Sequence, residues 1–286
     1  MRRLALSLLL FGAVAVWGWT FVLVKEAVAG YGVLSFLAVR YAIAAAAIAA
    51  LTAWRADRRS LGAGMAIGVP LAAGFLLQTF GLRHTTASNS GVITGLFVVF
   101  VPLTNRLLFG QRTERVALAA IAVSVLGLGL LSGAAPHGVA LGDLLTLGAA
   151  AAFGLHVALL GRYSKHYATG ALTLGQLVCA AALFAAACPL AERLAWPTPR
   201  VWGIILLTAL VATAAAFYIQ TLVQQRLSAI QVAMILLMEP LFAAVFGYLL
   251  AGDRLTGVQI IGAAMMTGAA SIVEVRPIFF RPGPSA

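Results

Sequence analysis

Charged residues are scarce in this sequence, and their scarcity excludes a water-soluble fold. They make up only 9% of the 286 residues, whereas hydrophobic residues make up 62%. An average soluble domain carries roughly 25% charged residues, because its surface needs polar groups. A lipid solvent removes that need, since side chains that face hydrocarbon should be apolar. The mean hydropathy of +1.02 therefore indicates a protein that lies mostly within a membrane.

The residues that build metal centres and catalytic clusters are also few. The two cysteines, Cys179 and Cys188, lie in one apolar run with no CxxC or Cys/His pattern around them. This spacing supports neither a disulfide framework nor a metal site. The eight acidic residues are scattered, and no P-loop is present, so ATP is not a direct energy source. We expect no metal, no cofactor and no enzymatic activity.

Basic residues outnumber acidic ones and give a net charge of +11. They lie mostly in short connections between apolar runs, where basic residues set membrane orientation. Because no nucleic-acid-binding motif accompanies them, we expect no nucleic-acid partner. At the N-terminus, Met1-Arg2-Arg3 precedes an apolar run that reaches Val24. A secretory signal has an apolar region of only ~7–15 residues, so we expect an uncleaved first membrane helix.

Long apolar runs occupy nearly all of the chain. A membrane-spanning helix needs about 20 mostly apolar residues. Ten such runs predict an all-α polytopic membrane protein without an extramembrane domain. The expected spans are residues 4–24, 34–54, 62–82, 88–108, 115–132, 141–160, 170–190, 200–222, 229–250 and 257–275.

The distribution of basic residues predicts the orientation of these spans. With a cytoplasmic N-terminus, most of the 19 Lys and Arg residues fall on the cytoplasmic side. Arg40 lies within a span, and the opposite side collects only Lys25, Arg83, Arg193, Arg200 and Arg254. Since cytoplasmic loops are enriched in Lys and Arg, both termini are expected in the cytoplasm.

The chain resembles itself at two shifts. A shift of 142 residues places Gln78-Thr79 on Gln220-Thr221, and Gly110-Gln111-Arg112 on Gly252-Asp253-Arg254. A shift of 136 residues places Trp17-Gly18 on Phe153-Gly154. These matches predict two five-helix repeats, at residues 1–135 and 136–286. Because five is odd, the second repeat would enter the membrane from the opposite side, and such inverted repeats are typical of secondary transporters.

Three motifs, taken in order, resemble the drug/metabolite transporter superfamily in its EamA-like branch. The first is Trp17-Gly18-Trp19-Thr20-Phe21 followed by Lys25. The second runs from Thr85-Thr86-Ala87-Ser88-Asn89 to Phe100-Val101-Pro102-Leu103 and Gly110-Gln111-Arg112. The third runs from Leu227-Ser228-Ala229 to Met238-Glu239-Pro240-Leu241 and Gly252-Asp253-Arg254-Leu255.

Within that superfamily the chain is similar to the bacterial aromatic amino acid exporters of the YddG type. The resemblance implies export of amino acids, aromatic or otherwise apolar, or of related metabolites across the bacterial inner membrane by alternating access. Export of drugs, quaternary amines or nucleosides stays open. So do a membrane enzyme that acts on lipid-linked substrates and a passive channel. We expect a monomer or a weak dimer.

Polar and aromatic groups inside the spans are the candidate binding residues, because such groups usually face a cavity or a partner helix. Aromatic rings would stack on an apolar solute, and glutamine amides would donate and accept hydrogen bonds. Helix–helix contacts, interfacial tryptophans and a helix cap at Asn89 are the structural alternatives. The candidate substrate-binding residues are Trp17, Thr20, Gln78, Asn89, His156 and Gln220.

Three ionisable groups lie within the spans. Glu239 is near the middle of its run and is the first candidate for proton coupling, with His156 as the second. Arg40 either reaches the outer interface, pairs with an acid, or binds a substrate carboxylate. At the end of the first span, Lys25 and Glu26 are expected to form a local pair.

Overall fold

The computed structural model describes residues 2–132, 141–192, 196–250 and 256–279, which are helical with short connections and contain no strand. Three short segments, η1 (Ala53–Arg55), η2 (Ser164–His166) and the π-helical η3 (Leu210–Ala215), join longer helices. The α-helices are α1 (Arg2–Gly30), α2 (Val33–Thr52), α3 (Arg58–Leu82), α4 (Ala87–Gly95), α5 (Phe97–Phe109), α6 (Arg115–Ser132), α7 (Leu141–Tyr163), α8 (Thr169–Ala191), α9 (Pro199–Ala209), α10 (Ala216–Gln224), α11 (Ala229–Leu236), α12 (Glu239–Leu250) and α13 (Gly257–Phe279).

Eight helical stretches of the described chain are long and apolar enough to cross a membrane. Two further apolar helices, Arg115–Leu131 and Gly257–Val273, are shorter. The prediction of an all-α protein with several membrane-spanning helices is therefore confirmed for the described residues. The eight stretches are Arg3–Gly30, Val33–Arg55, Arg58–Leu82, Asn89–Phe109, Leu141–His166, Thr169–Ala191, Pro199–Gln224 and Ala229–Phe246.

Side-chain caps start several helices at the expected breaks. The carboxylate of Asp57 accepts the Ser60 N–H at 2.8 Å before α3, and Thr86 accepts the Asn89 N–H at 3.0 Å before α4. At α11, Ser228 and Gln231 form a reciprocal capping box. Each cap satisfies backbone donors that have no partner within the helix.

Two of the expected spans are broken in the middle, which the sequence analysis did not predict. Between α4 and α5, Leu96 N–H donates to Ile93 at 3.1 Å. Between α11 and α12, Met238 N–H donates to Ile235 at 3.0 Å. Both are tightened turns, and they lie 142 residues apart, at the repeat shift. Pro240 helps to explain the second break, because proline has no N–H to continue an α-helix.

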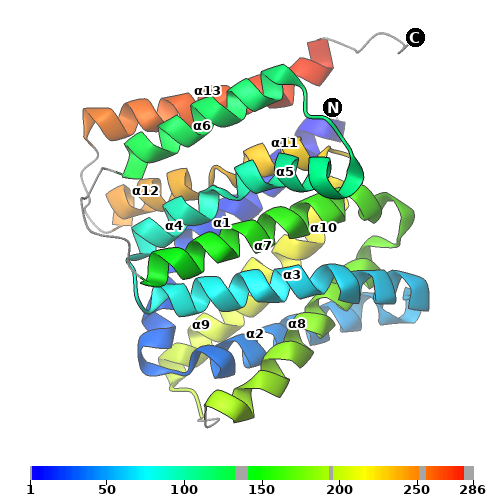
Figure 1. Ribbon diagram of the computed structural model, residues 1–286. Helices are drawn as coiled ribbons and strands as arrows, with labels where there is room; N and C mark the ends of the chain where they lie inside the picture. The colour runs from blue at the N-terminus through cyan, green and yellow to red at the C-terminus, as the bar shows by residue number, and fades with distance from the viewer. Residues whose placement is uncertain (1, 133–140, 193–195, 251–255, 280–286) are drawn as a thin grey trace.

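The helices form layers that run roughly side by side (Figure 1). α6 and α13 pack together along one edge, α2 and α8 pack together near the other, and α3 contacts both α7 and α8. The N-terminal end of α1 and the C-terminal end of α13 lie at the same end of the bundle (Figure 1).

Two glycines bring helices into backbone contact. A Cβ at Gly18 of α1 would lie 2.7 Å from the Glu239 carbonyl oxygen and 2.8 Å from the Phe242 Cβ. A Cβ at Gly154 of α7 would overlap the Phe100 Cβ. No other residue fits without displacing the partner helix. The two contacts correspond under the repeat shifts, since Gly18 maps to Gly154 and Phe242 to Phe100.

The structure changes some expected boundaries. α1 extends to Gly30, so Lys25 and Glu26 lie inside the helix and do not close it. The 200–222 run is not uniformly α-helical, because η3 interrupts it. Three predicted features lie outside the described residues: Arg193, the Gly252-Asp253-Arg254 motif and the 135/136 repeat boundary.

Candidate functional site

A cavity lies among the helices, and its space free of protein atoms, open solvent included, is about 720 Å³. Its walls come from α1, α2, α3, α4, α5, α7, α10, α11 and α12. Apolar and aromatic side chains form most of the lining, with two charged residues, Arg40 and Glu239, among them. The lining residues are Trp17, Thr20, Phe21, Val24, Arg40, Phe75, Gln78, Thr79, Leu82, Thr94, Phe97, Phe153, His156, Val157, Phe217, Gln220, Leu236 and Glu239.

The lining follows helical spacing on each wall. On α3 the residues are Phe75, Gln78, Thr79 and Leu82, at positions i, i+3, i+4 and i+7. This spacing places side chains on one face of a helix. α1 contributes four residues with the same spacing, beginning at Trp17. On α1 and α3, the residues that line the cavity therefore all lie on one face of the helix.

The lining also corresponds between the two parts of the chain. The 136-residue shift places Trp17 on Phe153 and Thr20 on His156. The 142-residue shift gives four further pairs in which both members line the cavity, whereas Thr79 and Leu82 fall on Thr221 and Gln224, which do not line it. These further pairs are Phe75 with Phe217, Gln78 with Gln220, Thr94 with Leu236, and Phe97 with Glu239.

Trp17 joins α1 to the π-helical segment. Its indole Nε1 donates to the Ala212 carbonyl oxygen at 2.6 Å, and its ring centroid lies 5.4 Å from that of Phe217. The side chain is buried. Short π-helical segments within α-helices are frequent at functional sites, and this one carries both Ala212 and Thr213.

Three phenylalanines that the sequence analysis did not select form an aromatic wall. The Phe75 ring lies 5.1 Å from Phe153 and 5.8 Å from Phe217, in edge-to-face geometry. Edge-to-face pairs are a favourable arrangement of aromatic rings. The helical spacing from Phe75 to Gln78, and from Phe217 to Gln220, was the signal in the sequence that would have found two of them.

Arg40 is buried, with only 2% of its surface exposed, although it carries a guanidinium. Its Nε donates to Thr213 Oγ1 at 2.8 Å. The guanidinium carbon lies 5.3 Å from the centre of the Phe75 ring and 5.8 Å from that of Tyr41. Within the described residues, no Asp or Glu forms an ion pair with it. The described part of the chain therefore supplies no acidic partner for Arg40, and the side chain is enclosed by neighbouring helices.

His156 is held by one hydrogen bond whose direction can be derived. Its Nε2 lies 2.7 Å from Gln176 Oε1. The Gln176 amide nitrogen is the donor to Leu172 O at 3.2 Å and to Thr221 Oγ1 at 3.4 Å, so the amide oxygen faces His156. An amide oxygen only accepts, and Nε2 must therefore carry a hydrogen. Nδ1 is the ring nitrogen left for another partner.

The two expected glutamines make different contacts. The Gln78 amide nitrogen donates to Thr94 Oγ1 at 3.0 Å, across α3 and α4. The Gln220 amide nitrogen donates to Gln224 Oε1 at 3.2 Å within its own helix. Thr20 bonds back to the Trp17 carbonyl at 3.0 Å. All three side chains are buried and line the cavity.

Glu239 is the first residue of α12, directly after the break in the helix. Its side chain is partly buried and lines the cavity. The break and the Gly18 contact hold its backbone against α1. Among the residues that the structure describes, no side chain pairs with its carboxylate.

Asn89 is the one candidate that lies outside this site. It does not line the cavity, and its N–H takes part in the cap of α4. The other six candidates, and Arg40, come together around the cavity. The described residues contain no group of three His, Cys, Asp or Glu side chains suited to a metal ion.

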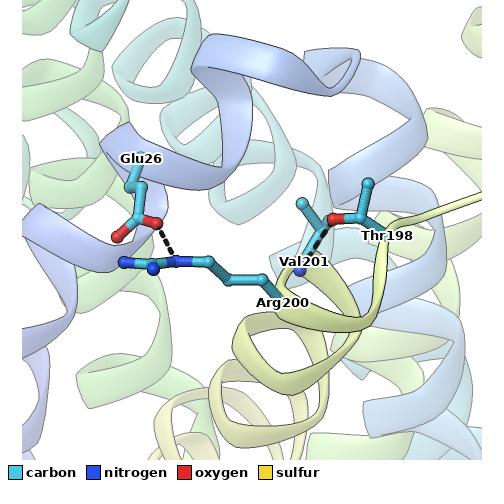
Figure 2. A network of polar contacts seen from close by, with 4 residues as sticks. All are labelled: Glu26, Thr198, Arg200 and Val201. Atoms are coloured by element: carbon cyan, nitrogen blue, oxygen red, sulfur yellow. Dashed lines mark hydrogen bonds and ion pairs between the residues drawn. The ribbon is translucent and has the colours of Figure 1, made fainter.

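The expected local pair of Lys25 and Glu26 is also wrong. Lys25 Nζ donates to the Thr85 carbonyl at 2.7 Å, and Glu26 forms an ion pair with Arg200 of α9. Figure 2 shows the Arg200 side chain extending from the start of α9 toward Glu26. Adjacent residues point in different directions on a helix, and each of these two therefore reaches a different neighbouring segment.

This arrangement defines the class: a polytopic helical membrane protein with a partly polar cavity among its helices. The EamA-like transporter family model matches residues 4–133 and again residues 140–274. The chain therefore belongs to the EamA-like transporter family, and a small-molecule solute and a membrane setting follow from that membership.

Two similar proteins extend the comparison. An uncharacterized transporter of Archaeoglobus fulgidus is 30% identical over 280 residues, which cover 96% of this chain and 88% of that protein. A protein of known crystal structure is similar in fold, with a TM-score of 0.77 and 20% identity. The match covers 94% of this chain and 96% of that one. Family membership does not favour the membrane-enzyme alternative.

Proposed function

We propose that this chain is a secondary transporter that exports amino acids with aromatic or other apolar side chains, or related metabolites, by alternating access across the bacterial inner membrane. The observation that carries the proposal is the cavity, which combines an aromatic wall with one basic and one acidic side chain. An amino acid presents the complementary groups: an apolar side chain, a carboxylate and an ammonium.

The proposed architecture is ten membrane-crossing helices in two inverted five-helix repeats, at 1–135 and 136–286. The eight long helices and the two shorter ones would make the ten. The two family matches, the matching helix breaks and the matching Gly18 and Gly154 contacts support two equivalent halves. Termini on one side agree with an even number of crossings (Figure 1).

Alternating access follows from such symmetry. In inverted-repeat transporters the solute site lies near the midplane between the repeats, and one half can adopt the conformation of the other. Here equivalent residues of both halves line one cavity. Exchange of the two conformations would open the cavity to each side of the membrane in turn.

Proton coupling would act through Glu239 or His156. Glu239 has a carboxylate that faces the cavity, and a lone carboxylate within a membrane is expected to bind a proton or a cation. The Nδ1 atom of His156 is the second candidate, because Nε2 is held by Gln176.

Transport by the purified protein in proteoliposomes tests the proposal. A panel of labelled amino acids, nucleosides and quaternary amines is presented with and without a pH gradient. We expect saturable uptake and counterflow of phenylalanine, tryptophan and leucine, and Glu239→Gln should abolish the response to the pH gradient. Transport of amines or nucleosides instead of amino acids would support the alternative that the protein exports those compounds. Non-saturable flux would indicate a channel.

The site is tested in the same assay. Trp17→Ala, His156→Ala and Glu239→Gln should each reduce transport, with Arg106→Gln on the exposed face of α5 as the control. Intact transport in all three variants would overturn the assignment of this cavity as the solute site.

A further inference from the structure

We infer that Arg40 binds the carboxylate of the transported solute and makes the protein selective for carboxylates over the matching amides and amines. The inference deepens the proposed function and rests on it. It names the side chain that distinguishes an apolar amino acid from an apolar amine of the same size.

The position of Arg40 is the first support. It lies seven residues after Val33, the first residue of α2, and so roughly 10 Å along the helix. It is 2% exposed and lines the cavity. A cation at such a place within a membrane helix is costly and usually faces a functional cavity.

The second support is the missing counter-charge. Of the guanidinium nitrogens, Nε is bound by the Thr213 hydroxyl, which carries no charge. Within the described chain no carboxylate forms an ion pair with Arg40, and the rings of Tyr41 and Phe75 lie next to its guanidinium. A buried charge without a partner is strongly unfavourable, so an anionic ligand in the cavity would bind with a large electrostatic gain.

The geometry of the remaining donors suits a carboxylate. A guanidinium presents its N–H groups in a planar fork that matches the two oxygens of a carboxylate. Thr213 accepts a hydrogen bond from Nε, which restrains the guanidinium. Thr213 itself is held by a hydrogen bond to the Thr208 carbonyl at 2.8 Å, within the π-helical segment. The guanidinium is therefore preorganised for the two nitrogens beyond Cζ to bind a ligand.

Comparison of the two halves gives an independent argument. The 136-residue shift that places α2 on α8 puts Arg40 on Gln176, which is buried and bound to neighbouring protein groups. A neutral amide thus fills the equivalent place in the second half with its hydrogen bonds satisfied. The arginine charge is not needed for the helices to pack, and ligand recognition accounts for it.

The neighbours of Arg40 indicate the rest of the ligand. Phe75 lies next to the guanidinium and makes edge-to-face contacts with Phe153 and Phe217. A carboxylate on Arg40 would therefore place the other end of a small solute against aromatic rings. The ligand class is a small monocarboxylate with an apolar or aromatic side chain.

Competition binding and transport with matched solutes test the inference. L-phenylalanine, L-phenylalaninamide, phenethylamine and 3-phenylpropanoate differ mainly in which charged group is present. Each competes against labelled phenylalanine and labelled 3-phenylpropanoate for the purified protein, in detergent for binding and in proteoliposomes for counterflow. In the native protein we expect both carboxylates to compete at least about tenfold better than the amide and the amine, as the loss of a charged hydrogen bond predicts.

Three variants test whether Arg40 is the source of the preference for carboxylates over amides. Arg40→Gln should reduce the acid-to-amide ratio toward one, Arg40→Lys should keep part of it, and Arg106→Gln, the same change on an exposed arginine, should leave it unchanged. The native ratio needs no variant, so the test survives if Arg40→Gln does not fold.

The outcomes separate this inference from the proposed function. Phenylalanine transport without any acid-to-amide preference, or with a preference that Arg40→Gln retains, overturns the carboxylate site and leaves amino acid export in place. Selective binding of the carboxylates without transport supports the site and counts against the export proposal. Failure to bind either carboxylate overturns both.

Discussion

The indole nitrogen of Trp17 donates to the Ala212 carbonyl oxygen at 2.6 Å, across 195 positions of the chain. This bond joins a helix of the first family match to the π-helical segment of the second. It fixes the ring of Trp17 at the cavity, next to Phe217.

Trp17→Phe should keep the ring contact and remove the hydrogen bond. We expect a loss of about 1 kcal/mol in unfolding free energy, because one buried hydrogen bond is removed. Thermal unfolding in detergent measures the change. Trp19→Phe, on the exposed side of the same helix, is the control and should change the midpoint little. Equal losses in the two variants would contradict the importance of the Ala212 bond.

Gly18→Ala should destabilise the contact between α1 and α12. The new Cβ would lie 2.7 Å from the Glu239 carbonyl oxygen and 2.9 Å from the Ala243 nitrogen, and backbone atoms have little room to move. Overpacking of this kind costs about 1–3 kcal/mol. The control is Gly12→Ala in the same helix, where nothing lies within 4 Å of the new atom. A similar melting temperature for the two variants would argue against the close contact.

Tyr41→Phe should raise stability. The Tyr41 side chain is fully buried, and its hydroxyl has no hydrogen-bond partner among the described residues. An unsatisfied buried polar group costs about 1–3 kcal/mol, which the substitution would recover in part. Tyr163→Phe, at a side chain that is 40% exposed, serves as the matched control. A lower midpoint for Tyr41→Phe than for the control would show that the hydroxyl has a partner in the native protein.

Asp57 should contribute a pH-dependent cap to α3. Hydrogen bonds from Ser60 hold the pKa of its carboxyl below the ordinary value of 3.8. A lowered folded-state pKa means that the stabilisation is fully present above the unfolded-state pKa and is lost as the pH falls through the lowered value. The melting-temperature difference between the native protein and Asp57→Ala should therefore be constant near neutral pH and shrink in acid.

A variant with a neutral hydrogen-bond acceptor at position 57 tests whether the pH dependence comes from the carboxylate. Asp57→Asn keeps a capping oxygen without the titrating group, and asparagine is as good an N-cap as aspartate. It should stay close to the native protein near neutral pH. A difference between Asp57→Ala and the native protein that did not change in acid would rule out the charge as the source of the cap's strength.

Hydropathy predicted the helices well, because each apolar run must bury its backbone polar groups in helical hydrogen bonds once it is in lipid. It did not predict the breaks at Leu96 and before Glu239, or the π-helical turn at Leu210–Ala215. Those features depend on which backbone groups find partners on other helices. A carbonyl such as that of Ala212, which accepts from Trp17, is satisfied by a contact that hydropathy does not contain.

The candidate site was predicted in part for a similar reason. Polar residues within spans stand out in the sequence, and Gln78, His156 and Glu239 do line the cavity. Phe75 and Phe217 did not stand out in the sequence, because a phenylalanine within a span can face lipid as readily as a cavity. Asn89 does not line the cavity, and the side chain that caps α4 is that of Thr86, which accepts from the backbone N–H of Asn89. The Glu26–Arg200 pair joins residues far apart in the chain, which no local pattern reveals.

The π-helical segment has a consequence for how this helix tolerates change in length. One residue of an α-helix corresponds to a rotation of about 100° around the axis. Loss of a single residue between Leu210 and Ala215 would let the segment close into a regular helix and would turn Thr213 away from Arg40 relative to Phe217 and Gln220. Natural relatives that keep the arginine should therefore show no gap in this stretch, while those with a one-residue gap should have replaced it.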